Sequence, residues 1–186
     1  MRPLSPIFGI LLLVLTSACT SGPTPAQSAL EAPVFALPSL EGEVVSLEDF
    51  RGRVVVIHFG TSWCPFCRAE DPHLEALFQT YKDRGVQALV VNVSEAEAAA
   101  AGWWKEAGFS FPMLLDRDGA VAARYAPSDA QPDLPRHEVM IASNLVVDRN
   151  GSVRFFSLLD SRAFDARLIA LRACLDEVLA EGGEGA

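Results

Sequence analysis

Residues 53–59 and 86–93 are almost continuously apolar and rich in β-branched side chains. Apolar runs of this length without polar alternation predict short strands that are covered on both faces. Between them, apolar residues recur with the period of a helix from Pro65 to Tyr81. The first half of the chain therefore predicts a buried strand, a helix and a second buried strand.

A helix is predicted over residues 95–107, directly after the second strand. Ser94, followed three residues later by Glu97, has the spacing of a capping box and should start this helix. Trp103 and Trp104 lie near its end. Adjacent helical positions face different directions, so we expect one indole in the core and the other exposed.

The remaining pattern predicts a strand at residues 111–115 and a long proline-containing loop at 126–138. Residues 139–147 and 152–157 flank a turn and predict an antiparallel hairpin. Residues 162–180 carry apolar side chains at helical spacing and predict a final amphipathic helix.

Cys64 and Cys67 stand where the first strand gives way to the helix. Pro65 suits a first helical turn, because its missing N–H would have no partner there. Cys64 should therefore lie at a helix N-terminus, where free N–H groups favour the thiolate and lower the pKa. Cys67 lies one turn deeper, within reach for a disulfide. The pattern predicts a redox dithiol, with Cys64 attacking and Cys67 resolving.

A structural zinc site is the main alternative for this cysteine pair. Such a site needs four ligands, and the sequence offers no second Cys-x-x-Cys and no His-x-x-x-His. We therefore favour the dithiol, expect no metal in it, and note that thiol–disulfide exchange needs no cofactor.

A series of short motifs runs through the chain in a fixed order. They are Pro33-Val34-Phe35-Ala36-Leu37, Val45-Ser46-Leu47, Phe50-Arg51-Gly52-Arg53, Trp63-Cys64-Pro65-Phe66-Cys67-Arg68-Ala69-Glu70-Asp71-Pro72, Phe111-Pro112-Met113-Leu114-Leu115-Asp116 and Val147-Asp148-Arg149-Asn150-Gly151. Over residues 33–180 the chain resembles thioredoxin-like thiol-disulfide oxidoreductases of the TlpA/ResA type, part of the redoxin group. The resemblance implies an α/β, thioredoxin-like fold with a central mixed β-sheet flanked by helices. It also implies that Glu70 lies near the cysteines and tunes their proton transfers, with Trp63 and Pro65 in supporting positions.

The chain departs from this family at Ala142. The family places a cis-proline six residues before the aspartate matching Asp148, beside the cysteines, where it helps to hold the substrate backbone. A cis bond before a residue other than proline costs about 2.5 to 4 kcal/mol, so we predict a trans bond between Ile141 and Ala142. Either Pro135 fills the role from a shifted loop or the substrate surface differs, and we favour the second.

The histidines and the last cysteine have separate interpretations. His58 lies in the first strand, six residues before Cys64, and is either a proton acceptor near the cysteines or a hydrogen-bonded core residue. His73 should lie at the surface, and His137 ends the long loop, from where it could approach Cys64. Cys174 is expected to be a small buried hydrophobe.

Residues 1–18 begin with Arg2, continue through an apolar core and end on small residues, which predicts a secretory signal too short to span a membrane. The segment ending at Cys19 resembles a bacterial lipobox, although Thr16 occupies a position where the family prefers Leu, Val or Ile. Unmodified secretion is the alternative. We expect lipidation of Cys19, and Thr20 after it, by resemblance, points to the outer membrane on its periplasmic side.

Residues 19–32 are small, polar and proline-containing after the cysteine, which predicts a flexible tether with a reach of about 20 Å. The folded domain should span 33–180, and 181–186 should be a frayed tail. The formal net charge of −9 argues against nucleic-acid binding and against adsorption to anionic lipid. Membrane association should come from the lipid anchor.

These observations predict a membrane-tethered periplasmic thiol-disulfide oxidoreductase that reduces a disulfide-bearing protein. A membrane thiol protein would have to supply its electrons, because the periplasm is kept oxidising. Two alternatives stay open. A redoxin-type thiol peroxidase matches Thr61, three residues before Cys64, but Ile57 stands where that pattern has proline. A copper chaperone would hold Cu(I) with Cys64, Cys67 and His137.

Overall fold

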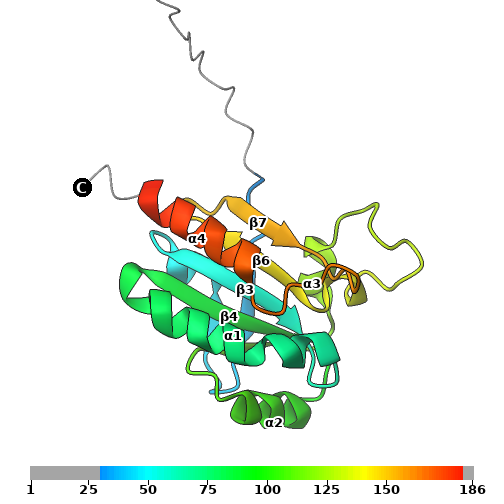
Figure 1. The fold of residues 1–186 in the computed structure, drawn as a ribbon. Coiled ribbons are helices and arrows are strands. Elements are labelled where there is room, and N and C mark those ends of the chain that lie inside the picture. Colours follow the sequence, from blue (N-terminus) through cyan, green and yellow to red (C-terminus); the bar gives the residue numbers. More distant parts are fainter. Residues whose placement is uncertain (1–29, 182–186) are drawn as a thin grey trace, which may run out of the picture.

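The computed structural model describes residues 30–181 and places them around a five-stranded sheet (Figure 1). The strand order is β5-β4-β3-β6-β7. β3, β4 and β5 run parallel, whereas β6 is antiparallel to β3 and β7 to β6. The strands are β3 (Val54–Gly60), β4 (Val86–Val93), β5 (Met113–Asp116), β6 (Ser143–Val147) and β7 (Val153–Ser157). This is the predicted mixed sheet.

The two faces of the sheet carry separate hydrophobic cores because neighbouring side chains of a strand point to opposite sides. Val54 and Val56 of β3 pack towards α1 (Pro65–Tyr81) and α4 (Ile169–Glu181), which lie on the same face in Figure 1. Trp103 of α2 (Glu97–Ala107) joins this core. Val55, Ile57 and Phe59 pack on the other face. That face is covered by α3 (Ala120–Tyr125) and the small hairpin of β1 (Ala36–Pro38) and β2 (Val44–Ser46). The predicted sheet flanked by helices is confirmed.

The order of elements in the first half agrees closely with the sequence pattern. β3 and β4 are buried at every position, and α1 begins at Pro65 as expected. The predicted short strand is also present, as β5, and Gly119 after it is the N-cap residue of the small helix α3, which ends at Tyr125. Of the two tryptophans, Trp103 is buried and Trp104 is half-buried.

The predicted capping box of α2 is wrong. The helix begins at Glu97 with Ala96 as its N-cap residue, and no side chain caps it. Ser94 has a left-handed backbone with a φ of 47°, so its side chain is not placed to cap the helix.

Two boundaries in the second half also differ from the prediction. The hairpin is present, but β6 starts at Ser143, because Glu138–Met140 forms a short 3-10 helix and Ala142 is left-handed. α4 starts at Ile169 rather than at residue 162. The expected apolar face is nevertheless buried, since Leu168 packs into the core from the loop and the others from the helix: Leu171, Leu175 and Val178.

The ends of the folded domain extend slightly beyond residues 33–180. Leu30 and Ala32, assigned to the tether, bond to the β6–β7 hairpin through Leu30 C=O with Val153 N–H and Ala32 N–H with Gly151 C=O. Glu181, assigned to the tail, belongs to α4 and pairs with Arg154. The predicted signal, Cys19, the tether before Leu30 and residues 182–186 lie outside the described residues.

Within residues 30–181, no helix has both the length and the apolar character that crossing a membrane requires.

We predict that Leu77→Ala, in the part of α1 that is buried against the sheet, lowers the free energy of unfolding by about 2 to 5 kcal/mol. Alanine keeps the helix but leaves a cavity in the core. Urea unfolding checks this, with Leu134→Ala at an exposed loop position as the matched control. Equal losses in the two variants would contradict the assignment of the α1 core face.

Candidate active site

Cys64 caps the N-terminus of α1, directly after the loop that leaves β3 at Gly60. Its Sγ accepts a hydrogen bond from the backbone N–H of Cys67 at 3.4 Å, and Pro65 occupies the first turn. Both cysteines are free thiols, with exposed fractions of 3% for Cys64 and 0% for Cys67. The geometry is that of a helix N-terminus holding a sulfur atom.

The two thiols have pKa values shifted in opposite directions. The hydrogen bond from the Cys67 thiol, aided by the N–H groups of Cys67 and Phe66 and opposed by burial, lowers the pKa of Cys64 to about 6. The same hydrogen bond, together with burial and the charge of the Cys64 thiolate, raises the pKa of Cys67. At neutral pH Cys64 is therefore the thiolate and Cys67 the proton carrier, which favours Cys64 as the attacking sulfur.

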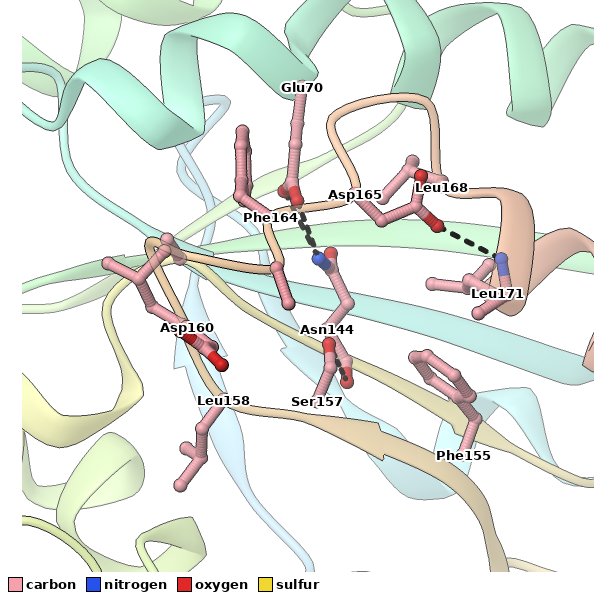
Figure 2. A pocket seen from close by; sticks show the side chains of 14 residues that line it. Glu70, Asn144, Phe155, Ser157, Leu158, Asp160, Phe164, Asp165, Leu168 and Leu171 are labelled. Atoms are coloured by element: carbon pink, nitrogen blue, oxygen red, sulfur yellow. Dashed lines mark hydrogen bonds between the residues drawn. The ribbon is translucent and has the colours of Figure 1, made fainter.

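A buried polar network lies between α1 and the sheet. Figure 2 shows Glu70 of α1 pointing towards Asn144 of β6, whose amide donates to both carboxylate oxygens at 3.1 Å. His58 Nδ1 lies 3.0 Å from Asn144 Oδ1 and 3.2 Å from Glu70 Oε2. Burial raises the pKa of Glu70 to about 8 and lowers that of His58 to about 4. His58 is therefore neutral at pH 7, and Glu70 titrates close to neutral pH.

The other ring nitrogen of His58, Nε2, lies on the side of Cys67. A Cβ placed on Gly60 would lie 2.6 Å from His58 Nε2, 2.8 Å from Trp103 Cη2 and 3.1 Å from Cys67 Sγ. Imidazole, indole and thiol therefore meet at one point, where only glycine fits. Nε2 is buried and has no hydrogen-bond partner among residues 30–181.

Trp103 is held in this position by Asp71 of α1. Its Nε1–H donates to both oxygens of that carboxylate, at 2.9 and 3.1 Å. Burial raises the pKa of Asp71 to about 6, although the indole hydrogen bond opposes the shift. The indole is thereby held beside Cys67 and His58.

A cavity of about 190 Å³ borders the network on the side of α4. Glu70 and Asn144 lie at its inner end, and the loop before α4 contributes Phe164 and Asp165 (Figure 2). The Phe164 ring packs edge-on against Phe66 of the Cys-x-x-Cys motif at 4.9 Å between centroids. The charge of Asp165 also raises the pKa of Glu70. The cavity has room for water beside the Glu70 carboxylate.

The backbone beside the active site differs from the usual substrate-holding segment. No peptide bond in residues 30–181 is cis, and Ala142 has a φ of 64°. Its N–H donates to Phe59 C=O at 2.8 Å, while the N–H of Ile141 donates to Glu138 C=O. Pro135 is exposed and its carbonyl accepts hydrogen bonds from the short 3-10 helix. With both amides engaged internally, the backbone of this segment differs from that of a cis-proline segment.

The remaining candidate residues separate into those at the dithiol and those away from it. Trp63, next to Cys64, is 66% exposed. His73 is half-buried rather than a surface residue, and its carbonyl accepts from Arg172. His137 packs against Gly119, and Cys174 is half-buried against the core. Among the residues that the structure describes, no three His, Cys, Asp or Glu side chains are grouped to hold a metal, so the copper ligand set is not assembled.

Residues 29–156, more than half of the chain, match the model of the AhpC/TSA family. The chain belongs to the AhpC/TSA family. Among curated proteins it is 28% identical over 123 residues to the thiol-disulfide oxidoreductase ResA of Bacillus thuringiensis subsp. konkukian. That alignment covers 66% of this chain and 65% of ResA, somewhat less than two thirds of the relative's length.

Solved structures support the same fold. A candidate protein disulfide isomerase from Bacteroides thetaiotaomicron is 26% identical, with a TM-score of 0.70 over 84% of this chain and 92% of that one. A candidate thiol:disulfide interchange protein DsbE from Chlorobium tepidum is 27% identical, with a TM-score of 0.67 over 81% and 96% of the two chains. The predicted resemblance to ResA-type proteins and the thioredoxin-like fold are confirmed.

The sequence alone did not indicate Asn144, Asp71 or the position of Trp103 beside Cys67 and His58. Asp71 had a usable signal, because it lies four residues after Cys67 and therefore on the same face of α1. Asn144 had a weaker one, as a polar residue in an otherwise apolar strand opposite His58 in the sheet.

We predict that Glu70→Gln changes how stability depends on pH. The folded-state pKa of Glu70 is about 8, above its ordinary value of 4.5, so the folded protein holds this proton more tightly. The stabilisation from Glu70 is present in full below pH 4.5 and is lost as the pH rises to about 8. As the pH rises across this range, the free energy of unfolding of Glu70→Gln should therefore increase relative to that of the wild type, by a few kcal/mol. Urea unfolding at a series of pH values measures the difference.

Glu41→Gln, at an exposed position, is the control and should run parallel to the wild type. A constant difference between Glu70→Gln and the wild type would contradict the raised pKa.

Proposed function

We propose that the protein is a thiol-disulfide oxidoreductase that reduces disulfides of other proteins through Cys64 and Cys67. The observation that carries this proposal is the pairing of a Cys64 thiol of lowered pKa at a helix N-terminus with a Cys67 thiol of raised pKa. A thiolate and a reserve thiol within one helical turn are what disulfide exchange needs. The similarity to the thiol-disulfide oxidoreductase ResA and to the candidate thiol:disulfide interchange protein DsbE supports the same activity.

The exchange proceeds in two substitutions at sulfur. The Cys64 thiolate attacks a substrate disulfide, whose S–S bond breaks, and the departing substrate thiolate takes up a proton. Cys67 then loses its proton and attacks Cys64 Sγ, which breaks the mixed disulfide and releases the second substrate thiolate, which is also protonated. The substrate gains two electrons and the enzyme keeps a disulfide between Cys64 and Cys67.

The second step needs a base for Cys67, and the buried network can supply one. With Nδ1–H facing Asn144 and Glu70, His58 presents the lone pair of Nε2 on the side of Cys67. The Cys67 proton passes to Nε2 while Nδ1–H passes its own to Glu70. Glu70 is the final acceptor in its ionised form, because its pKa, about 8, exceeds that of His58, about 4, and the relay therefore strengthens as the pH rises towards 8. In this proposal His58 relays the proton and Glu70 stores it.

The location that we propose is supported by the N-terminal sequence. The apolar segment before Cys19 and the resemblance to a lipobox support export and lipidation at that cysteine. The protein would then work on the periplasmic side of a bacterial membrane, as an outer-membrane lipoprotein. A membrane thiol protein would return the dithiol to its reduced form.

We predict that Cys67→Ser accumulates a mixed disulfide with oxidised insulin and that Cys64→Ser does not. Serine cannot resolve the adduct in the first variant, whereas the second has lost the attacking sulfur. Intact-mass spectrometry after acid quenching measures the adduct, and Cys174→Ser should react like the wild type.

Two results would contradict the proposal. One is an insulin adduct in Cys64→Ser but none in Cys67→Ser. The other is a wild type that leaves insulin oxidised yet consumes peroxide in a Cys64-dependent way, which would favour the thiol peroxidase.

A further inference from the structure

The carboxylate of Glu95 connects the loop between β3 and α1 to the neighbouring strand β4. Asn92, the next-to-last residue of β4, lies beside Gly60, its register partner, and its Nδ2 donates to Glu95 Oε2 at 2.7 Å. Glu95 Oε2 also accepts the backbone N–H of Ser62 at 3.0 Å, and Glu95 Oε1 accepts the Ser62 hydroxyl. A single side chain therefore joins the end of β4 to the active-site loop through three hydrogen bonds.

The backbone before Glu95 is strained in a way that allows this placement. Ser94 has a φ of 47°, and its N–H donates to Asp116 C=O at 2.8 Å. A residue other than glycine in the left-handed region costs of order 1–3 kcal/mol, and such strain is concentrated at functional sites. This turn leaves Glu95 outside α2, facing Ser62 instead of capping the helix.

Ser62 is the point at which the loop changes from buried to exposed. Thr61 before it is buried, and its carbonyl accepts the N–H of Cys64 at 3.3 Å. Trp63 after it is exposed beside Cys64. Fixing Ser62 therefore fixes both the sulfur of Cys64 at the helix N-terminus and the outward direction of the Trp63 ring.

We propose that Glu95 is a positioning residue for the dithiol, which acts through Ser62 to hold Cys64 over the first turn of α1 and Trp63 towards the protein substrate. The part that concerns substrate rests on the proposed function. The part that concerns Cys64 does not.

Glutamine can take over this role, and alanine cannot. The Oε1 of a glutamine, placed where Glu95 Oε2 lies, would accept from Ser62 N–H and from Asn92. Its Nε2 would donate to the Ser62 hydroxyl, which can rotate to accept. Because all three bonds survive without the charge, Glu95→Gln separates a geometric role from an electrostatic one.

The experiment compares Glu95→Ala, Glu95→Gln, Ser62→Ala and the Glu95→Ala/Ser62→Ala double variant. Glu97→Gln is the matched control, since it removes a carboxylate from the same segment that pairs with Arg117 at the surface. Two quantities are measured: the pH midpoint of Cys64 alkylation by iodoacetamide, and kcat/KM for insulin reduction.

In Glu95→Ala the alkylation midpoint should rise above the wild-type value, because a loosened loop carries Cys64 away from its N–H donors. The value of kcat/KM should fall roughly tenfold, the equivalent of one to two net hydrogen bonds. Glu95→Gln and Glu97→Gln should retain wild-type values. The double variant should be no worse than Glu95→Ala, because Ser62→Ala removes only the hydroxyl bond, which Glu95→Ala already removes together with the other two.

Lower alkylation midpoints in both Glu95→Ala and Glu95→Gln would show that Glu95 acts by its charge and would overturn the proposal. Fully additive losses in the double variant would do the same. If Glu95→Ala does not fold, Ser62→Ala carries the test, and an unchanged midpoint and rate in that variant overturn the proposal. A wild type that fails to reduce insulin would defeat the proposed function, while the alkylation results would still decide the position of Cys64.

Discussion

At Gly60 the end of β3 comes closer to its neighbours than any side chain would allow. His58 Nε2, Trp103 and Cys67 Sγ converge where a Cβ would stand, and the first two contacts would be shorter than 3.0 Å. The buried thiol lies beside an imidazole only because this position has no side chain. The arrangement of α1 over the sheet, the indole from α2 and the polar network below α1 all depend on this close approach.

Three titrating groups around this point have pKa values that burial and hydrogen bonding have moved far from their ordinary order. The thiol of Cys64 has become more acidic than the carboxyl of Glu70, with pKa values of about 6 and about 8, and His58 has fallen to about 4. A site in which a thiolate and a protonated carboxyl can coexist near neutral pH is suited to moving protons as disulfides form and break. The sheet supplies Asn144 and His58, and the helix supplies Glu70, so the proton path that we propose crosses the interface between them.

The local parts of the fold were predictable because local physical signals determine them. Continuous apolar runs marked β3 and β4, and Pro65 marked the start of α1, which in turn placed Cys64 at a helix N-terminus. The failures arose where tertiary contacts override a local pattern. Leu168 has helical spacing but packs from a loop, and Ser94 has the spacing of a cap but a left-handed backbone. The family resemblance indicated Glu70, but its partner Asn144 and the role of Glu95 depend on strands meeting across the sheet.

To pass electrons to a protein substrate, as we propose, Cys64 and Cys67 must form a reversible disulfide. The most direct test equilibrates the reduced protein with graded glutathione buffers and measures the fraction that contains a Cys64–Cys67 disulfide. We expect complete, reversible two-electron oxidation between these two cysteines, with a potential at or below about −230 mV, as is usual for a reductase. A potential near about −120 mV would contradict the reducing direction, and a pair that forms no reversible disulfide would contradict the account as a whole.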